Sequence, residues 1–152
     1  MSTMTQTAVQ VYTVFIKASP EQIWAAITKP EFTSKYFYGS LVDSTLEPGS
    51  PIIGWSPDRE QKWTDGEILE SDPPHRLRYS WRSLWDESQA AEEASRVTWE
   101  IEPSDGGTSL LTVTHDQLEG SPKTAVSVSG AGWMLVISGL KTLLETGRPM
   151  LG

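Results

Sequence analysis

The sequence predicts an α+β fold in which a curved antiparallel sheet wraps a long C-terminal helix. Two observations lead to this fold class: six short strand-like segments follow one another in the middle of the chain, and one strongly amphipathic helix closes it. Successive strands joined by short turns pair as an antiparallel meander, and a sheet of that length twists and curls. The closing helix can cover its apolar concave face. The expected element order is β-α-α-β6-α.

The first elements are a strand and two short helices. Residues 10–16 are rich in β-branched and aromatic types, which is typical of a strand. Ser19 can cap a helix, Pro20 suits its first position, and Gln22 completes a capping box. A second short helix is expected over residues 30–36, because its leading proline ends the first one, and the two helices should form a V. The apolar stripe of the first helix is Ile23, Trp24 and Ile27.

Turn residues divide the next part of the chain into strands. Residues 76–81 alternate cleanly, with apolar side chains on one face and arginines on the other, and residues 97–102 alternate in a similar way. A tight turn over residues 104–107 predicts a hairpin. Residues 83–94 are acidic and weakly patterned, which predicts a mobile loop, and residues 117–129 are expected to form a connection without periodicity. The expected strands are 41–46, 51–55, 63–71, 76–81, 97–102 and 108–116.

The closing helix has the strongest pattern in the chain. Its apolar residues recur at positions i, i+3, i+4 and i+7, which is the pattern of a helix with one buried face. Gly147 is a natural C-cap, and Pro149 prevents the helix from continuing. The apolar positions are Trp133, Val136, Ile137, Leu140, Leu143 and Leu144.

Composition limits the function classes. The 152 residues, 38% hydrophobic and 21% charged, suit a single domain over residues 1–152 with its core at about residues 10–148. A net charge of −8 argues against binding to nucleic acid or to anionic membranes. No apolar run approaches the ~20 residues of a membrane span, and residues 1–10 lack the features of a secretory signal. Together with the absence of cysteine, this predicts a cytoplasmic protein.

Seven tryptophans are unusual in a chain of this length. A curled sheet around one straight helix leaves room for an apolar cavity, and aromatic side chains can line such a cavity or fill it. Both alternatives stay open from the sequence. Trp85, in the acidic loop, is a candidate lid. The residues expected at a ligand are Phe37, Trp63, Tyr79, Trp81, Trp99, His115, Trp133 and Ile137.

His115 is the one weak candidate for catalysis. It shares strand parity with Leu111 and Val113, so it should point inward, where a neutral histidine could act as a general base or orient a ligand. A core histidine hydrogen-bonded to the backbone is the simpler interpretation. Glu67 and Glu70 are expected on opposite faces of one strand and so form no carboxylate pair. No metal site and no cofactor is predicted, because the chain's two histidines lack clustered carboxylates.

Several segments resemble a known family. Residues 15–27 (FIKASPEQIWAAI) resemble the opening of the START-like, or SRPBCC, superfamily. Residues 65–74, 77–81, 107–115 and 132–147 together resemble the branch named for the C-terminal domain of the activator of heat-shock protein 90 ATPase. The resemblance covers nearly the whole chain. It implies the helix-grip fold, also seen in the birch-pollen allergen, and a cavity between the sheet and the long helix.

Three functions are compatible with these patterns. The first is a small-molecule-binding domain for an apolar ligand, either aromatic or lipidic. The second is a cyclase- or hydrolase-type enzyme that acts on such a ligand, with His115 and Tyr79 as its polar groups. The third is a co-chaperone-like protein-interaction module that uses the outer sheet surface. The expected partner is a small apolar ligand, and assembly as a homodimer stays open.

Overall fold

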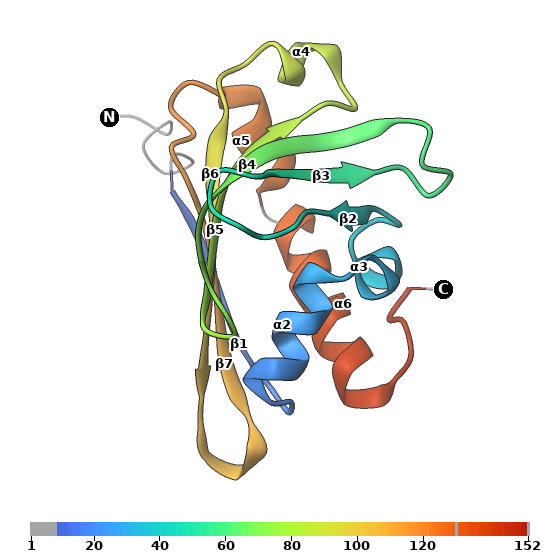
Figure 1. Ribbon diagram of the computed structural model, residues 1–152, viewed down its shortest axis with the longest axis vertical. Helices are drawn as coiled ribbons and strands as arrows, with labels where there is room; N and C mark the ends of the chain where they lie inside the picture. The colour runs from blue at the N-terminus through green and yellow to red at the C-terminus, as the bar shows by residue number, and fades with distance from the viewer. Residues whose placement is uncertain (1–8, 130, 152) are drawn as a thin grey trace.

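The computed structural model describes residues 9–129 and 131–151. Its elements are β1 (Gln10–Ile16), α2 (Pro20–Thr28), α3 (Pro30–Tyr36), β2 (Leu41–Asp43), β3 (Pro51–Trp55), β4 (Lys62–Asp72), β5 (Arg76–Ser83), α4 (Glu87–Ala90), β6 (Ser95–Pro103), a 3-10 turn (Asp105–Gly107), β7 (Ser109–Asp116), α5 (Pro122–Val128) and α6 (Ala131–Thr146). The seven strands form one antiparallel sheet in the order β1-β7-β6-β5-β4-β3-β2. Helices α2, α3 and α6 lie on one side of it, and β2 and β3 curl over them (Figure 1). The predicted fold class is confirmed.

The start of α2 is built as its sequence predicts. Ser19 Oγ accepts a hydrogen bond from the backbone N–H of Gln22 at 3.1 Å, and the Gln22 side chain accepts one from the Ser19 N–H at 2.8 Å. Pro30 occupies the first position of α3, and Lys29 alone separates it from the end of α2. The hydroxyl of Tyr36 donates to the carbonyl of Ala26 at 2.7 Å. This bond ties the two helices together at an angle (Figure 1).

The core lies between the concave face of the sheet and α6. The alternation predicted for β5 and β6 is confirmed: their inward side chains, from Leu77 to Ile101, are at most 7% exposed. Each large apolar side chain that is fully buried contributes roughly 1.5–3 kcal/mol. Truncating Leu140, which is fully buried in α6, to alanine is therefore expected to cost about 2–5 kcal/mol. The α6 residues packed in this core are Trp133, Val136, Ile137, Leu140 and Leu143.

A β-bulge decides the direction of Trp63. In the pairing of β3 with β4, Gly54 lies opposite Thr64 and Trp55 lies opposite Lys62, so Trp63 is the extra residue. Simple alternation would put Trp63 on the same face as Asp65, which forms an ion pair with Arg82 on the outer face. A bulge turns two consecutive side chains toward the same face. Trp63 consequently points inward beside Thr64.

A second bulge corrects the expectation for the two glutamates of β4. The register against β5 shifts between Ile68 and Glu70, and Glu70 pairs with Arg78 on the outer face. Glu67 also lies on the outer face, because it shares strand parity with Asp65 and precedes Ile68, which points inward at 1% exposure. The prediction that Glu67 and Glu70 lie on opposite faces is wrong, because the extra residue reverses the alternation.

Two segments in which no helix was predicted contain short helices. The segment predicted as a mobile loop includes α4, which is capped by Asp86 through a bond from the Ser88 N–H to its carboxylate at 3.0 Å. The connection after β7 includes α5. The carboxylate of Glu92 accepts hydrogen bonds from the backbone N–H groups of Lys123 and Thr124 at 2.8 and 2.9 Å. The acidic segment therefore caps α5 and holds it in place.

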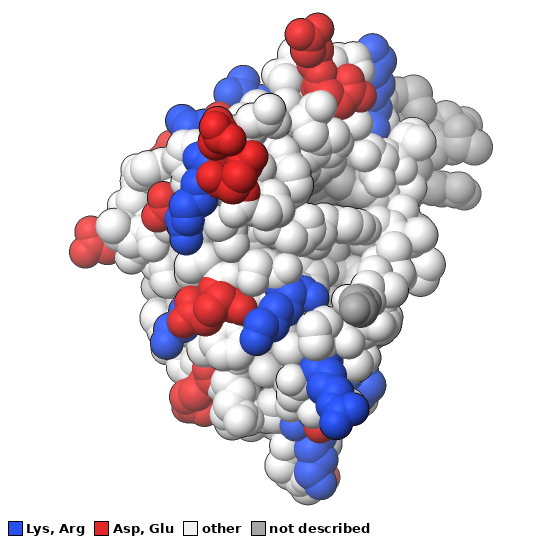
Figure 2. All heavy atoms as spheres, turned by 90° about the vertical axis from the view of Figure 1, so that its right-hand side faces the viewer, with Lys and Arg blue, Asp and Glu red and all other residues white. Residues whose placement is uncertain are grey.

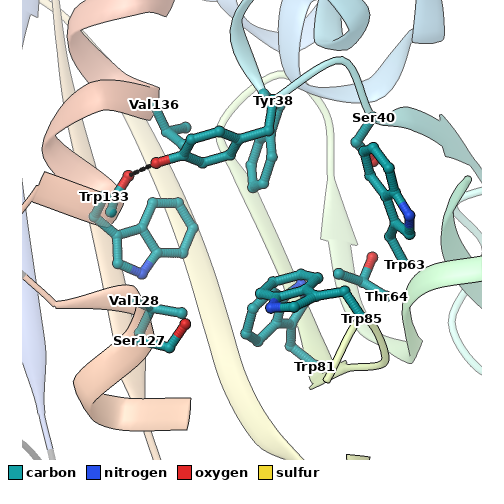
Figure 3. Close-up of a pocket in the computed structure, with 12 residues that line it drawn as sticks. Tyr38, Ser40, Trp63, Thr64, Trp81, Trp85, Ser127, Val128, Trp133 and Val136 are labelled. Carbon is teal, nitrogen blue, oxygen red and sulfur yellow. Dashed lines mark hydrogen bonds between the residues drawn. The ribbon is translucent and has the colours of Figure 1, made fainter. Parts of the chain in front are cut away.

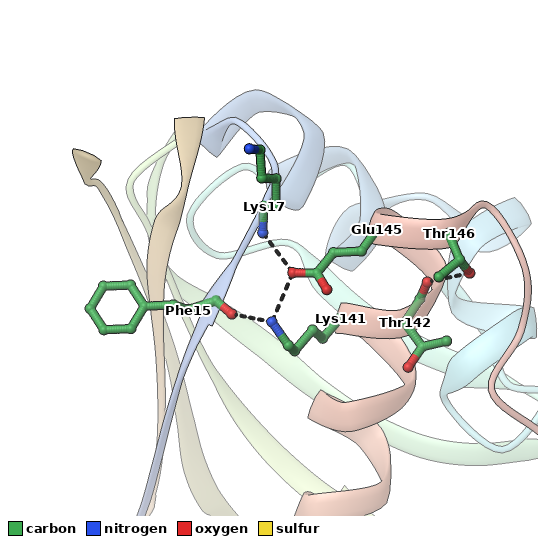
Figure 4. Close-up of polar contacts among 6 residues, drawn as sticks. All are labelled: Phe15, Lys17, Lys141, Thr142, Glu145 and Thr146. Atoms are coloured by element: carbon green, nitrogen blue, oxygen red, sulfur yellow. Dashed lines mark hydrogen bonds and ion pairs between the residues drawn. The ribbon is translucent and has the colours of Figure 1, made fainter. Parts of the chain in front are cut away.

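The end of α6 is attached to the edge strand β1 (Figure 4). Lys141 Nζ donates to the carbonyl of Phe15 at 2.7 Å and forms an ion pair with Glu145 at 2.8 Å. Glu145 also accepts a hydrogen bond from the backbone N–H of Lys17 at 2.8 Å. Gly147, with φ of 77°, ends the helix as predicted and donates its N–H to Leu143 O at 2.8 Å. These bonds occupy part of an edge that would otherwise be open to pairing.

Among the described residues, no single helix has the length and apolar composition of a membrane span; α5 and α6 meet that test only as a pair bent by 43°.

Candidate ligand-binding site

A pocket of about 370 Å³ opens between the curled end of the sheet and the beginning of α6. None of the described residues that line it carries a formal charge, and aromatic rings supply much of its wall. Figure 2 shows a hollow near the middle of one face of the molecule, with uncharged residues around it. The residues lining this main pocket are Phe37, Tyr38, Ser40, Trp63, Thr64, Trp81, Trp85, Ser127, Val128, Gly132, Trp133 and Val136.

Two tryptophans form one wall of the main pocket (Figure 3). Trp81 points inward because it alternates with Leu77 and Tyr79 along β5, and it is 7% exposed. Trp85 follows β5 and is 49% exposed, with its ring centroid 5.8 Å from that of Trp81. One ring is thus fixed in the core while its neighbour reaches solvent. This position at the rim suits the lid that the sequence suggests for Trp85.

Tyr38 approaches the pocket from the opposite end, where α3 leads into β2 (Figure 3). Phe37, the residue before it, also lines the pocket. Phe37 packs edge-on against Trp133 with ring centroids 6.0 Å apart. Tyr38 has φ of 55°, in the left-handed region that few residues with a side chain adopt. Its hydroxyl donates to the carbonyl of Gly132 at 3.0 Å. Tyr38 therefore links the end of α3 to the start of α6 along the rim of the pocket.

His115 lies behind the pocket, and both of its ring nitrogens are in hydrogen-bonding contact with other side chains. The indole N–H of Trp133 donates to His115 Nδ1 at 3.1 Å, which assigns the ring proton to Nε2. Nε2 lies 2.6 Å from Ser95 Oγ, which in turn donates to the carbonyl of Trp81 at 3.2 Å. Burial lowers the pKa of His115 from 6.5 to about 4, so the ring is neutral near pH 7. Both ring nitrogens are occupied within the protein.

The predicted ligand residues divide into three groups. Phe37, Trp63, Trp81 and Trp133 line the main pocket. Tyr79 and Trp99 line a smaller inner pocket of about 40 Å³, which shares Phe37, Ser40, Thr64 and Trp81 with the main one. His115 and Ile137 are buried at 0% and 8% exposure and are in neither lining set.

Several lining residues have no counterpart in the sequence-based expectations. Ser127 and Val128 belong to α5, whose start, Ser121 followed by Pro122, repeats the Ser-Pro pattern that predicted α2 and could have located it. Tyr38 adopts its position through a backbone conformation that no motif announces. Among the described residues, no group of three or more His, Asp or Glu side chains is placed to hold a metal ion.

Comparison with known proteins relates most of the chain to a family. A family model described as "Activator of Hsp90 ATPase homolog 1-like protein" matches residues 17–145. No curated protein sequence matches the chain. At 20–22% identity, the similarity to solved structures concerns the fold.

Three of these structures show how complete the similarity is. CalU16 from Micromonospora echinospora is 22% identical with a TM-score of 0.69, over 91% of this chain and 77% of that one. Protein MLL2253 from Mesorhizobium loti is 22% identical with a TM-score of 0.73, over 90% and 96%. PFC0360w, an HSP90 activator from Plasmodium falciparum, is 20% identical with a TM-score of 0.72, over 93% and 98%.

Proposed function

The chain belongs to the family of proteins like activator of Hsp90 ATPase homolog 1, and we propose that it binds a small, largely apolar molecule in its main pocket. One observation carries this proposal: a pocket of about 370 Å³ whose described lining is aromatic and uncharged. Ligand sites are typically concave, mostly apolar and larger than about 300 Å³. Aromatic rings on both sides of the pocket suit a flat ligand, which can stack on them or meet their edges.

The geometry of the polar groups supports binding more than catalysis. A general base needs a nitrogen or oxygen that can reach the reacting proton. Both nitrogens of His115 are bonded to Trp133 and Ser95, and its side chain is fully buried. Burial raises the pKa of Tyr79 to about 12, so its phenol keeps its proton near pH 7. The two polar residues of the enzyme hypothesis are thus better suited to holding a structure than to moving a proton.

A second candidate function follows from the family description, namely an interaction with an Hsp90-type ATPase through the outer sheet surface. That surface carries Arg82 and Arg96, which pair with Asp65 and Asp116 at 3.0 and 2.7 Å. Because these charges satisfy each other within the chain, they offer less to a partner. The ATP hydrolysis rate of a purified Hsp90 tests this candidate: an increase on adding the protein supports it, and an unchanged rate contradicts it.

The ligand-binding proposal is tested with N-phenyl-1-naphthylamine, an uncharged aromatic dye that fluoresces in apolar surroundings. We expect a saturable increase in its emission with the unmodified protein. Ser127→Trp places an indole in the pocket from the exposed surface of α5 and should abolish the increase. Val126→Trp is the matched control, since Val126 is 69% exposed on the same helix and lies outside the lining. Equal dye binding by all three proteins, or none by any, contradicts the proposal.

A further inference from the structure

Two hydroxyl groups lie where the main and inner pockets meet, and a third belongs to a residue of the inner pocket. Ser40 and Thr64 line both pockets, and Tyr79 lines the inner one. The hydroxyls of Ser40 and Thr64 both lie against Gly54. A Cβ atom placed on Gly54 would touch Thr64 Oγ1 and lie 2.8 Å from Ser40 Oγ, so the two oxygens are close to each other. Figure 3 shows Ser40 and Thr64 on the same side of the main pocket, across from Trp133. We call Ser40, Thr64 and Tyr79 the hydroxyl corner.

These hydroxyls have unused hydrogen-bonding capacity. Within the described part of the chain, Ser40 Oγ and Thr64 Oγ1 have no hydrogen-bond partner, and neither oxygen is fully buried. Tyr79 accepts the indole N–H of Trp99 at 2.9 Å, and its own proton finds no acceptor among the same residues. Tyr79 is 7% exposed, so this proton lies in an apolar interior. Buried polar groups normally find partners, and a group left without one costs stability.

The unused hydrogen-bond donors and acceptors define which chemical group the hydroxyl corner would bind. Tyr79 already uses an acceptor site for Trp99, so what it offers a ligand is a donor. A neutral carbonyl oxygen has two lone pairs and can accept from two donors at once. The inner pocket, at about 40 Å³, has room for one small group of that kind and little more. An anionic group is a poor fit, because none of the described residues lining either pocket carries a positive charge to offset its desolvation.

We propose that the ligand is an uncharged aromatic carbonyl compound, whose ring system lies between Trp81 and Trp133 and whose carbonyl oxygen accepts hydrogen bonds in the hydroxyl corner. This inference rests on the proposed function, because it assigns a ligand class to the same pocket. It divides the site by chemistry: the aromatic wall holds the ring system, and Ser40, Thr64 and Tyr79 select for an oxygen at one end.

The test compares two competitors of equal shape. In 2-acetylnaphthalene the side group carries C=O, and in 2-isopropenylnaphthalene it carries C=CH₂, so the pair differs in the hydrogen-bond acceptor. Each displaces N-phenyl-1-naphthylamine from the unmodified protein and from variants, and the measured quantity is the ratio of the two affinities. Since hydration of the free competitors is the same in every titration, the change in ratio between proteins reports on the corner alone.

Thr64→Val removes one hydroxyl and keeps the shape of the side chain. We expect it to weaken binding of the ketone about threefold to tenfold, with the alkene changed less than about twofold. Ser40→Ala and Tyr79→Phe should act in the same direction and keep the test decisive if one variant folds poorly. The matched control is Thr112→Val, which removes a half-buried threonine hydroxyl on β7, outside both lining sets. Thermal unfolding of each variant verifies that it is folded.

The outcomes separate the two proposals. A ratio that falls in the corner variants and stays constant in Thr112→Val supports the ligand class. If the dye and both competitors bind but the affinity ratio is unchanged in every corner variant, the hydroxyl corner does not bind the carbonyl oxygen. This inference is then overturned, while the proposed function stands. If the unmodified protein does not bind the dye at all, the proposed function itself fails.

Discussion

The indole N–H of Trp133 donates a hydrogen bond to Nδ1 of His115 at 3.1 Å, joining the beginning of α6 to the end of β7. Trp133 lines the main pocket, and His115 fixes its orientation from behind. His115 points inward, as predicted, but it lines neither pocket, and its ring nitrogens bond to Trp133 of the pocket wall and to Ser95 behind it. A buried polar network of this kind specifies one arrangement of helix on sheet.

The buried state of His115 predicts an acid-sensitive fold. Burial lowers its pKa to about 4, against 6.5 when unfolded, and the charge of nearby Asp116 acts in the opposite direction. The unfolded chain therefore binds more protons between these values, and stability falls as the pH drops through this window. The part due to His115 is about 2 kcal/mol between pH 7 and pH 5. Urea unfolding at both pH values measures it, with His115→Gln as the reference that should lack this loss. An equal loss in both proteins would show that His115 is not the cause.

Glu92 is predicted to stabilise the fold through α5. Its carboxylate accepts bonds from the backbone N–H groups of Lys123 and Thr124 and from the Thr124 hydroxyl. Glu92→Ala should lower the free energy of unfolding by about 1–2 kcal/mol, the usual cost of a lost helix cap. Urea denaturation checks this value against Glu119→Ala, which changes an exposed glutamate close to α5. Equal stability of the two variants would contradict the capping role.

Tyr38 is predicted to slow the exit of a bound molecule. Its hydroxyl bonds to Gly132 across the rim of the main pocket, and the side chain is 56% exposed. Tyr38→Phe removes that bond and keeps the ring, so we expect dye dissociation to become about threefold to tenfold faster, as for the loss of one hydrogen bond. Stopped-flow dilution of the dye complex measures this rate. An unchanged dissociation rate would mean that the bond does not hold the rim closed.

The uncharged lining predicts discrimination against anions. The 2-naphthoate ion has the size of 2-acetylnaphthalene and carries a carboxylate in place of the acetyl group. It should compete with the dye at least about tenfold less well at pH 7, because burying a charge without a partner is costly. Comparable competition by the two compounds would show that the site provides a cation, or that the dye binds elsewhere.

Local patterns in the sequence were sufficient for most of the fold. The capping box at Ser19, the alternation from Leu77 to Trp81 and the stripe of α6 depend on neighbouring residues alone, and each is present in the structure. The direction of Trp63 and the shared face of Glu67 and Glu70 depend on bulges. A bulge arises from pairing with another strand, so alternation within β4 could not reveal it.

The site was less predictable than the fold for a related reason. Alternation tells which face a side chain occupies, but not how far along the strand the pocket extends. Trp81 and Trp99 both point inward, yet Trp81 reaches the main pocket and Trp99 is buried beneath it at 2% exposure. Some aromatic side chains thus line the main pocket, while others fill the core beneath it. In the hydroxyl corner, Ser40 and Thr64 come together beside Gly54 of β3, an approach that no short motif encodes.

The most direct measurement is a titration of the ¹⁵N-labelled protein with 2-acetylnaphthalene, followed through the indole N–H signals of its tryptophans. The signals of Trp63, Trp81 and Trp85, which line the main pocket, should shift together along one saturation curve. Those of Trp24 and Trp55, which are in neither lining set, should stay in place. Single Trp→Phe substitutions assign the signals. Shifts at Trp24 or Trp55 with none at the pocket tryptophans, or no saturable shift at all, would contradict binding between the sheet and α6.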